Sequence, residues 1–191
     1  MSRFFTADLH FGHANIIRYC DRPFAGVAEM DEALVQRWNE VVTDADEVWV
    51  LGDVAMGQIR SSLLHVGRLR GRKVLVPGNH DGCWRGHGPQ ATEWAVRYLD
   101  AGFAEITGEL VELALGGATI LASHFPYDGD SHDEDRFRVH RPIDDGRVLL
   151  HGHVHTSWRR RGRQINVGCD VWDYRPVPAD VLAEVVRCAV E

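Results

Sequence analysis

The 191-residue sequence lacks the features that mark membrane, secreted or repeat proteins. No apolar run approaches the length of a membrane span, and no fixed-period repeat or low-complexity linker interrupts the chain. The N-terminus lacks the pattern of a signal peptide. The four cysteines are scattered without CxxC spacing, which favours reduced thiols. We therefore expect a single domain over residues 1–191, cytoplasmic and without a membrane partner.

The sequence also has fewer basic than acidic residues, with 21 Lys and Arg against 28 Asp and Glu and a formal net charge of −7. A protein that binds nucleic acid through its general charge is usually basic, so this balance argues weakly against such a partner. Bound divalent cations would offset part of the deficit. The oligomeric state has no signal in the sequence.

Apolar periodicity predicts an α/β fold. The expected helices lie at 30–42, with Asp31 as the N-cap, and at 58–70, 91–100 and 178–189. The expected strands lie at 3–7, 47–53, 73–81 (strand, then loop), 110–115, 118–124, 147–155 and 163–168. The Gly-Gly pair between 110–115 and 118–124 indicates a hairpin, and an arginine-rich turn, 158–163, separates the last two strands. Early alternation of helix and strand with late hairpins predicts layers built on a mixed sheet.

Polar side chains follow five of these strands. The short motifs are Asp8-Leu9-His10, Gly52-Asp53, Gly78-Asn79-His80-Asp81, Ser123-His124 and His151-Gly152-His153-Val154-His155. Each alone has an ordinary explanation, such as a Gly-Asp turn. Together they place only nitrogen and oxygen ligands at strand ends, where loops of α/β sheets converge on one crevice. Side chains two apart, as in D-x-H and H-x-H, point in roughly the same direction along an extended loop, so each pair could hold one metal site.

In this order the motifs resemble those of the calcineurin-like metallophosphoesterases. The resemblance covers residues 8–155 and implies an α/β sandwich of two mixed β-sheets flanked by helices, with two bound metal ions. It implies that the first metal is held by Asp8, His10, Asp53 and His155. It implies that the second is held by Asp53, Asn79, His124 and His153, with Asp53 bridging. His80 would be catalytic beside the metals. Asp81 would hold the His80 ring or cap the next helix.

Two cations about 3.5–4 Å apart can lower the pKa of a bridging water and supply hydroxide at neutral pH. His80 could then protonate or hydrogen-bond the leaving oxygen. Imidazole, carboxylate and amide ligands without thiolate favour Mn, with Fe, Zn, Co or Ni as alternatives, over Mg or Ca. None of the four cysteines lies in a motif, so we expect structural roles for them.

Within the family, the chain is similar to the small bacterial and phage phosphoesterases. It carries their D-x-H-F-G-H-x-N-I-I string at residues 8–17 and lacks the arginine motif G-D-x-x-D-R-G of protein phosphatases. Near the first strand end, the expected substrate contacts are His13, Asn15 and Arg18. Alternatively, Asn15 caps a short helix and His13 contacts a metal ligand.

Two polar segments each have two alternative roles. Residues 128–142 are expected to form a loop beside the active site, where Arg136, Arg138, His140 and Arg141 could meet a substrate phosphate. Acidic neighbours offset them, namely Asp128, Asp130, Asp133, Glu134 and Asp135. The 158–163 run is either a solvated turn or an anion site.

The sequence thus predicts a metal-dependent phosphoesterase that acts through a metal-bridging hydroxide. Its expected partner is a small phosphate ester, and a phosphodiesterase acting on a nucleotide-like molecule is the favoured reading. The alternatives are a phosphomonoesterase or a nuclease at the same site, and a non-catalytic scaffold. The scaffold is disfavoured because His80 and every ligand position are present.

Overall fold

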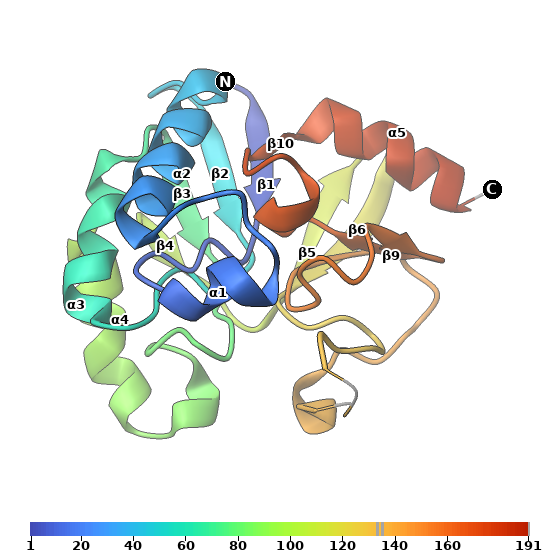
Figure 1. Ribbon diagram of the computed structural model, residues 1–191. Helices are drawn as coiled ribbons and strands as arrows, with labels where there is room; N and C mark the ends of the chain where they lie inside the picture. Colours follow the sequence, from blue (N-terminus) through green and yellow to red (C-terminus); the bar gives the residue numbers. More distant parts are fainter. Residues whose placement is uncertain (133, 135, 191) are drawn as a thin grey trace.

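The computed structural model describes residues 1–132, 134 and 136–190. Its strands form two five-stranded sheets that lie side by side in Figure 1. The first sheet has the order β10-β1-β2-β3-β4. Its strands are β1 (Arg3–Thr6), β2 (Glu47–Val50), β3 (Arg72–Leu75), β4 (Glu105–Ile106) and β10 (Val177–Pro178). Only the β1–β10 pair of this sheet is antiparallel among the described pairings.

The second sheet has the order β5-β6-β7-β9-β8 and is also mixed. Its strands are β5 (Leu110–Leu115), β6 (Ala118–Ser123), β7 (Leu149–His151), β8 (Arg160–Arg161) and β9 (Gln164–Asn166). β5 and β6 form the hairpin that the Gly-Gly pair predicts, since both glycines have positive φ. β6, β7 and β9 run parallel.

Helices cover the sheets. They are α1 (Ala14–Tyr19), α2 (Val27–Val41), α3 (Ile59–Ser62), α4 (Gln90–Asp100) and α5 (Ala179–Val190). In Figure 1, α2, α3 and α4 lie beside the first sheet and α5 lies over β5 and β6. Two flanked mixed sheets confirm the predicted fold class. No helix in the described part of the chain is long and apolar enough to cross a bilayer.

Alternation along the strands divides the apolar residues between two cores. Phe4, Val48 and Val50 face α2 and its neighbours. Phe5 and Trp49 face the other way and pack with residues of the second sheet and of α5. Because successive strand residues point to opposite faces, a sheet buried on both sides produces near-continuous apolar runs of this kind.

Three local predictions are wrong. Asp31 lies inside α2, whose N-cap is Gly26, and its carboxylate instead accepts the Gly12 N–H at 3.1 Å. The 58–70 segment becomes helical only as α3 and the following 3-10 turn Leu63–Arg68. Hydroxyls of Ser61 and Ser62 bond to nearby carbonyls there, which weakens regular helix.

The third error concerns the late strands. The 147–155 and 163–168 segments do not form a hairpin, because β7 and β9 pair in parallel. The arginine run supplies β8, which forms the antiparallel hairpin with β9. Short alternating segments carry no signal for parallel or antiparallel pairing, and the partner is chosen by tertiary packing.

We expect Leu150→Ala to lower the free energy of unfolding by about 2–5 kcal/mol, because Leu150 is fully buried between the sheets. Urea unfolding monitored by circular dichroism measures this change. The control is Leu110→Ala, on a strand position that is 47% exposed, where we expect a much smaller loss. Equal losses for the two variants would contradict the position assigned to the inter-sheet core.

Candidate metal centre

The motif-bearing loops meet at the carboxyl ends of the strands. The Asp8 N–H donates to Gly52 O and the His10 N–H to Asp53 O, both at 3.0 Å, so the loop after β1 runs along the loop after β2. Ala7, after β1, forms a parallel bridge with Gly168, after β9, which links the two sheets at their strand ends. The site therefore lies at the seam between the sheets.

Most of the expected ligands have left-handed backbone. Their φ angles lie between 47° and 70° at Asp8, His10, Asp53, His153 and His155. This conformation is uncommon for residues other than glycine and persists where the surroundings impose it, often at functional sites. The side chains of the D-x-H and H-x-H pairs thus converge through tight turns, and the expected alternation along an extended loop is wrong.

Two glycines make room for the Asp8 carboxylate. A Cβ on Gly152 or on Gly168 would lie 2.7 Å from Asp8 Oδ2, closer than real Cβ contacts allow. The His153 N–H donates to both Asp8 oxygens, at 3.1 and 3.0 Å. The H-G-H motif therefore needs its glycine because the backbone passes directly over the first carboxylate.

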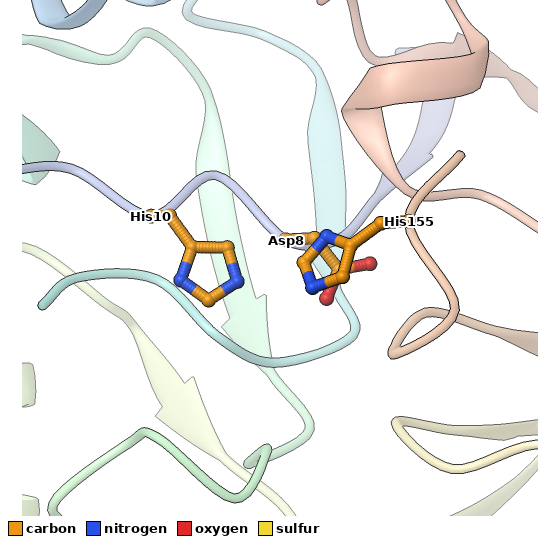
Figure 2. A group of neighbouring side chains, drawn as sticks. All are labelled: Asp8, His10 and His155. Atoms are coloured by element: carbon orange, nitrogen blue, oxygen red, sulfur yellow. The ribbon is translucent and has the colours of Figure 1, made fainter. Parts of the chain in front are cut away.

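One group of ligand atoms comes from Asp8, His10 and His155, and lies within 4.8 Å (Figure 2). Asp8 and His10 follow each other along the loop after β1, and His155 comes from the loop after β7. Both His10 ring nitrogens are buried without a hydrogen-bond partner in the described part of the chain. Burial lowers the His10 pKa well below its usual value, and the nearby His155 and Arg22 lower it further. A neutral, unpartnered imidazole of this kind fits a metal ligand.

Asp53 lies between this group and the next. Its Oδ2 is 3.6 Å from His10 Nε2 and 3.5 Å from His124 Nε2. Burial favours the protonated acid, but His124 and His80 outweigh it and lower the Asp53 pKa. A ligand shared by two ions needs such a position, and Asp53 has it.

A second group consists of Asn79 and the imidazoles of His124 and His153. The Asn79 Oδ1 lies 3.1 Å from His124 Nε2 and 3.1 Å from His153 Nδ1. His124 Nδ1 lies 2.8 Å from Leu51 O, and because a carbonyl only accepts, Nδ1 carries the hydrogen. His153 Nε2 lies 3.2 Å from a carboxylate oxygen of Asp130.

The consequence is that the unprotonated Nε2 of His124 faces the amide oxygen of Asn79, which His153 Nδ1 also approaches. The lone pairs of His124 Nε2 and Asn79 Oδ1 repel at 3.1 Å, and a cation held between them would remove the repulsion. Burial lowers the His153 pKa to about 4, which keeps that ring neutral. This donor set fits a divalent metal ion.

His80 faces the same region without joining either group. Its Nε2 is 3.9 Å from Asp53 Oδ2, its side chain is 42% exposed, and it lines the cavity above the ligands. Its backbone N–H donates to Asp53 Oδ1 at 2.9 Å. Burial lowers the pKa of the ring, although Asp53 opposes the shift.

Asp81 does not hold the His80 ring or cap a helix. Its fully buried carboxylate accepts the N–H groups of Asp53, Val54 and Gly78 at 2.8–3.0 Å, and the Tyr98 hydroxyl at 3.1 Å. These bonds occupy both oxygens. Asp81 therefore fixes the loop of Asp53 against the loop of Asn79, which the local sequence did not reveal because its partners are distant.

The ligand groups open into a cavity of about 460 Å³. His13 lines it, but Asn15 and Arg18 do not, and their side chains bond to each other at 2.9 Å on the exposed side of α1. The reason is helical geometry, since Ile16, Tyr19 and Cys20 share the cavity face at spacings of three and four. Asn15 is also no cap, because His13 holds the N-cap position.

Sequence reasoning missed the residues that support His155. Asp170 Oδ2 lies 3.2 Å from His155 Nδ1, and the Arg22 guanidinium donates to both Asp170 oxygens at 2.7 and 3.0 Å. Arg22 also donates to the carbonyls of Asp8 and Leu9. Asp170 follows β9 as Asp53 follows β2, so the strand-end pattern could have found it.

Cys20 is buried in the first core, in line with the structural role expected of the cysteines. It also lines the cavity, and its sulfur lies within 4.8 Å of ligand atoms of His155 and Asp170. The sequence did not indicate this position because Cys20 reaches the site from the end of α1 rather than from a motif.

The polar segments 128–142 and 158–163 differ in whether they line the cavity. Arg136, Ser131 and His132 of the 128–142 loop line the cavity. In the 158–163 run, by contrast, Arg161 pairs with Asp128 and Arg163 with Asp144 on the surface, and neither lines the cavity. These pairs agree with a solvated turn. Asp133 and Asp135 lie outside the described residues.

The chain belongs to the calcineurin-like phosphoesterase superfamily, whose domain model matches residues 1–173. It is therefore a metal-dependent phosphoric ester hydrolase. It is 41% identical to the Gene 66 protein of Mycobacterium phage D29, over 96% of this chain and 94% of that protein. It is 37% identical to the Gene 66 protein of Mycobacterium phage L5, over 96% and 93%. The solved structure of protein AQ665 from Aquifex aeolicus, of unknown function, is 26% identical and superposes with a TM-score of 0.71 over 97% of this chain and 99% of that one.

We expect about two Mn²⁺ per chain by elemental analysis after saturation, and loss of both from Asp53→Asn, because Asp53 faces both ligand groups. Asp144→Asn, at a surface ion pair, is the control and should keep both. Wild-type metal content in Asp53→Asn would show that Asp53 does not bridge.

Proposed function

We propose that this chain is a phosphodiesterase that uses two divalent metal ions, Mn²⁺ foremost, to hydrolyse a nucleotide-like small molecule. The observation that carries the proposal is the position of Asp53, whose Oδ2 lies 3.6 Å from His10 Nε2 and 3.5 Å from His124 Nε2 beside the cavity. Asp8, His10, Asp53 and His155 would hold one ion. Asp53, Asn79, His124 and His153 would hold the other.

When bound, two such ions neutralise charge on the phosphoryl group and lower the pKa of water. Residues of the chain would position the phosphoryl group and assist the leaving oxygen. Asp53 and Asn79 fix where the phosphoryl group lies, because Asp81 ties their loops together. His80 projects from the Asn79 loop into the cavity, where a ring N–H could donate to the leaving oxygen. Since burial lowers its pKa, we expect a neutral ring and a hydrogen-bonding role near pH 7.

The substrate class follows from the cavity. Its size of about 460 Å³ is that of small-molecule sites, which favours a small ester over a nucleic-acid duplex. Ile16, Tyr19 and Met56 add an apolar wall to the cavity lining, which suits a base or another flat group. The net charge of −7 also speaks against the nuclease alternative.

We expect His80→Ala and Asn79→Ala to lower activity for different reasons. Removing the His80 ring should leave two bound metals and lower kcat by about 10²–10⁴-fold, the usual value of one such group. Removing Asn79 deletes a ligand, so excess Mn²⁺ should restore part of the activity. Rates and metal content across a Mn²⁺ titration separate the two outcomes. Rescue of His80→Ala by metal would instead make the imidazole a ligand.

The ester preference tests the proposed substrate class. We expect a higher kcat/KM for bis-p-nitrophenyl phosphate than for p-nitrophenyl phosphate, because the chain lacks the arginine motif of protein phosphatases and an apolar wall can take the second ester group. The wild-type protein without added metal is the control and should be inactive. A clear preference for the monoester would favour a phosphomonoesterase.

A further inference from the structure

Asp130 organises the part of the chain that covers one side of the cavity. Its side chain is 1% exposed and accepts hydrogen bonds from the Arg136 backbone N–H at 3.1 Å and from Arg136 Nη2 at 2.8 Å. The N–H of His132 donates to it at 3.3 Å. An ionised carboxylate this buried is stable only when paired, and Arg136 provides the shorter ion pair at 2.8 Å, with Arg141 Nη2 at 3.8 Å.

The same carboxylate reaches the metal centre. Its Oδ2 lies 3.2 Å from His153 Nε2, while Nδ1 of that ring faces Asn79. A carboxylate on the far nitrogen of a ligating imidazole fixes the ring's tautomer and orientation and raises its basicity. Asp130 thus contacts both a candidate metal ligand and the arginine beside it.

Arg136 is placed to meet an anion. Among the cavity-lining residues that the structure describes, it is the one side chain with a permanent positive charge. Its side chain is 39% exposed. Asp130 engages its Nε and Nη2, whereas no acceptor in the described part of the chain binds Nη1. The guanidinium is therefore held on one edge and open on another, as an arginine that binds phosphate would be.

We propose that Arg136 binds a second anionic group of the substrate, outside the phosphoryl group that is cleaved, and that Asp130 is the positioning residue that holds Arg136 and His153 in register. This deepens the proposed function and rests on it. The substrate class is then a phosphodiester that carries a further phosphate, and a nucleoside with phosphates on both sides of its sugar presents two anionic groups in the same way.

The order of contacts indicates that Arg136 binds a second anionic group of the substrate and not the phosphoryl group that reacts. The reacting phosphoryl group would be held on the side of the ligand atoms, including His153 Nδ1. Asp130 binds the opposite nitrogen of that ring, so a whole imidazole separates it from the ligand atoms. Arg136 is bound to Asp130 rather than to any expected ligand in the described part of the chain, and its side chain lines the cavity.

The test is binding, measured by isothermal titration calorimetry on the Mn²⁺-loaded full chain. The two ligands are thymidine 5′-monophosphate and thymidine 3′,5′-bisphosphate, with chromatography confirming that both stay intact. We expect wild type to bind the bisphosphate about 10- to 100-fold more tightly, the range for one hydrogen-bonded charge pair. Arg136→Gln should lose that preference while keeping its affinity for the monophosphate, and Arg136→Lys should keep part of it.

The matched control is Arg163→Gln, which removes an arginine from a surface pair with Asp144 and should keep the wild-type preference. The proposal for Arg136 is overturned if wild type does not distinguish the ligands, or if Arg136→Gln retains the preference. Because no turnover is needed, a protein that binds as expected but cleaves no ester would overturn the proposed function alone.

The positioning role of Asp130 is tested by measuring Mn²⁺ affinity. Asp130→Asn keeps the shape of the side chain but removes its charge, and should weaken Mn²⁺ binding about 10- to 100-fold in the electron paramagnetic resonance signal of free Mn²⁺. It should also reduce the preference for the bisphosphate. Asp144→Asn is the control, and circular dichroism checks the fold. Wild-type Mn²⁺ affinity in Asp130→Asn would overturn the positioning role, and the Arg136 variants remain decisive should Asp130→Asn fail to fold.

Discussion

The structure depends on burying electron-pair donors at the seam between two sheets. Asp8, Asp53 and His124 are almost completely buried with their ligand atoms close together, and in water each would be solvated. Burial raises the Asp8 pKa to about 6, and the neighbouring Asp53 contributes to the rise, although His155 and His124 oppose it. Burying such groups without a counter-charge is costly. A divalent cation would supply that counter-charge, so metal binding would stabilise the folded seam.

Holding the donors together requires a rigid frame, and the frame is made of other buried polar groups. Asp81 ties the loops of Asp53 and Asn79, and Arg22 ties the loop of Asp8 to Asp170. Each uses hydrogen bonds to backbone groups, which are fixed in space once the strands have paired. The strained, left-handed backbone at Asp8, Asp53 and His155 is maintained by these restraints and by the glycines that admit them.

The sequence predicts which donor side chains come together because one simple rule governs their placement. A donor directly after a buried strand must lie at the same edge as its counterparts, and this rule brought Asp8, Asp53 and His124 to one site. Roles that depend on distant partners were not predictable in this way. Asp31 looked like a helix cap, but Gly12, which approaches from another loop, is its partner. Asn15 and Arg18 share a motif with His13, yet the turn of α1 directs them away from the cavity.

The supporting carboxylates were the hardest to recognise, and they reveal how the site is arranged. His155 rests on Asp170 and His153 rests on Asp130, so one ligand of each group has a carboxylate on its far nitrogen. Asp170 is itself locked by Arg22 in the interior, where both side chains are fully buried. Asp130 is paired with Arg136, which reaches the cavity. The two ligand groups therefore differ in what lies behind them: one is anchored to the interior of the protein, and the other to the arginine on the substrate side. Arg136 is thus connected through Asp130 to the imidazole of His153, whereas His155, which also lines the cavity, is backed by a buried ion pair.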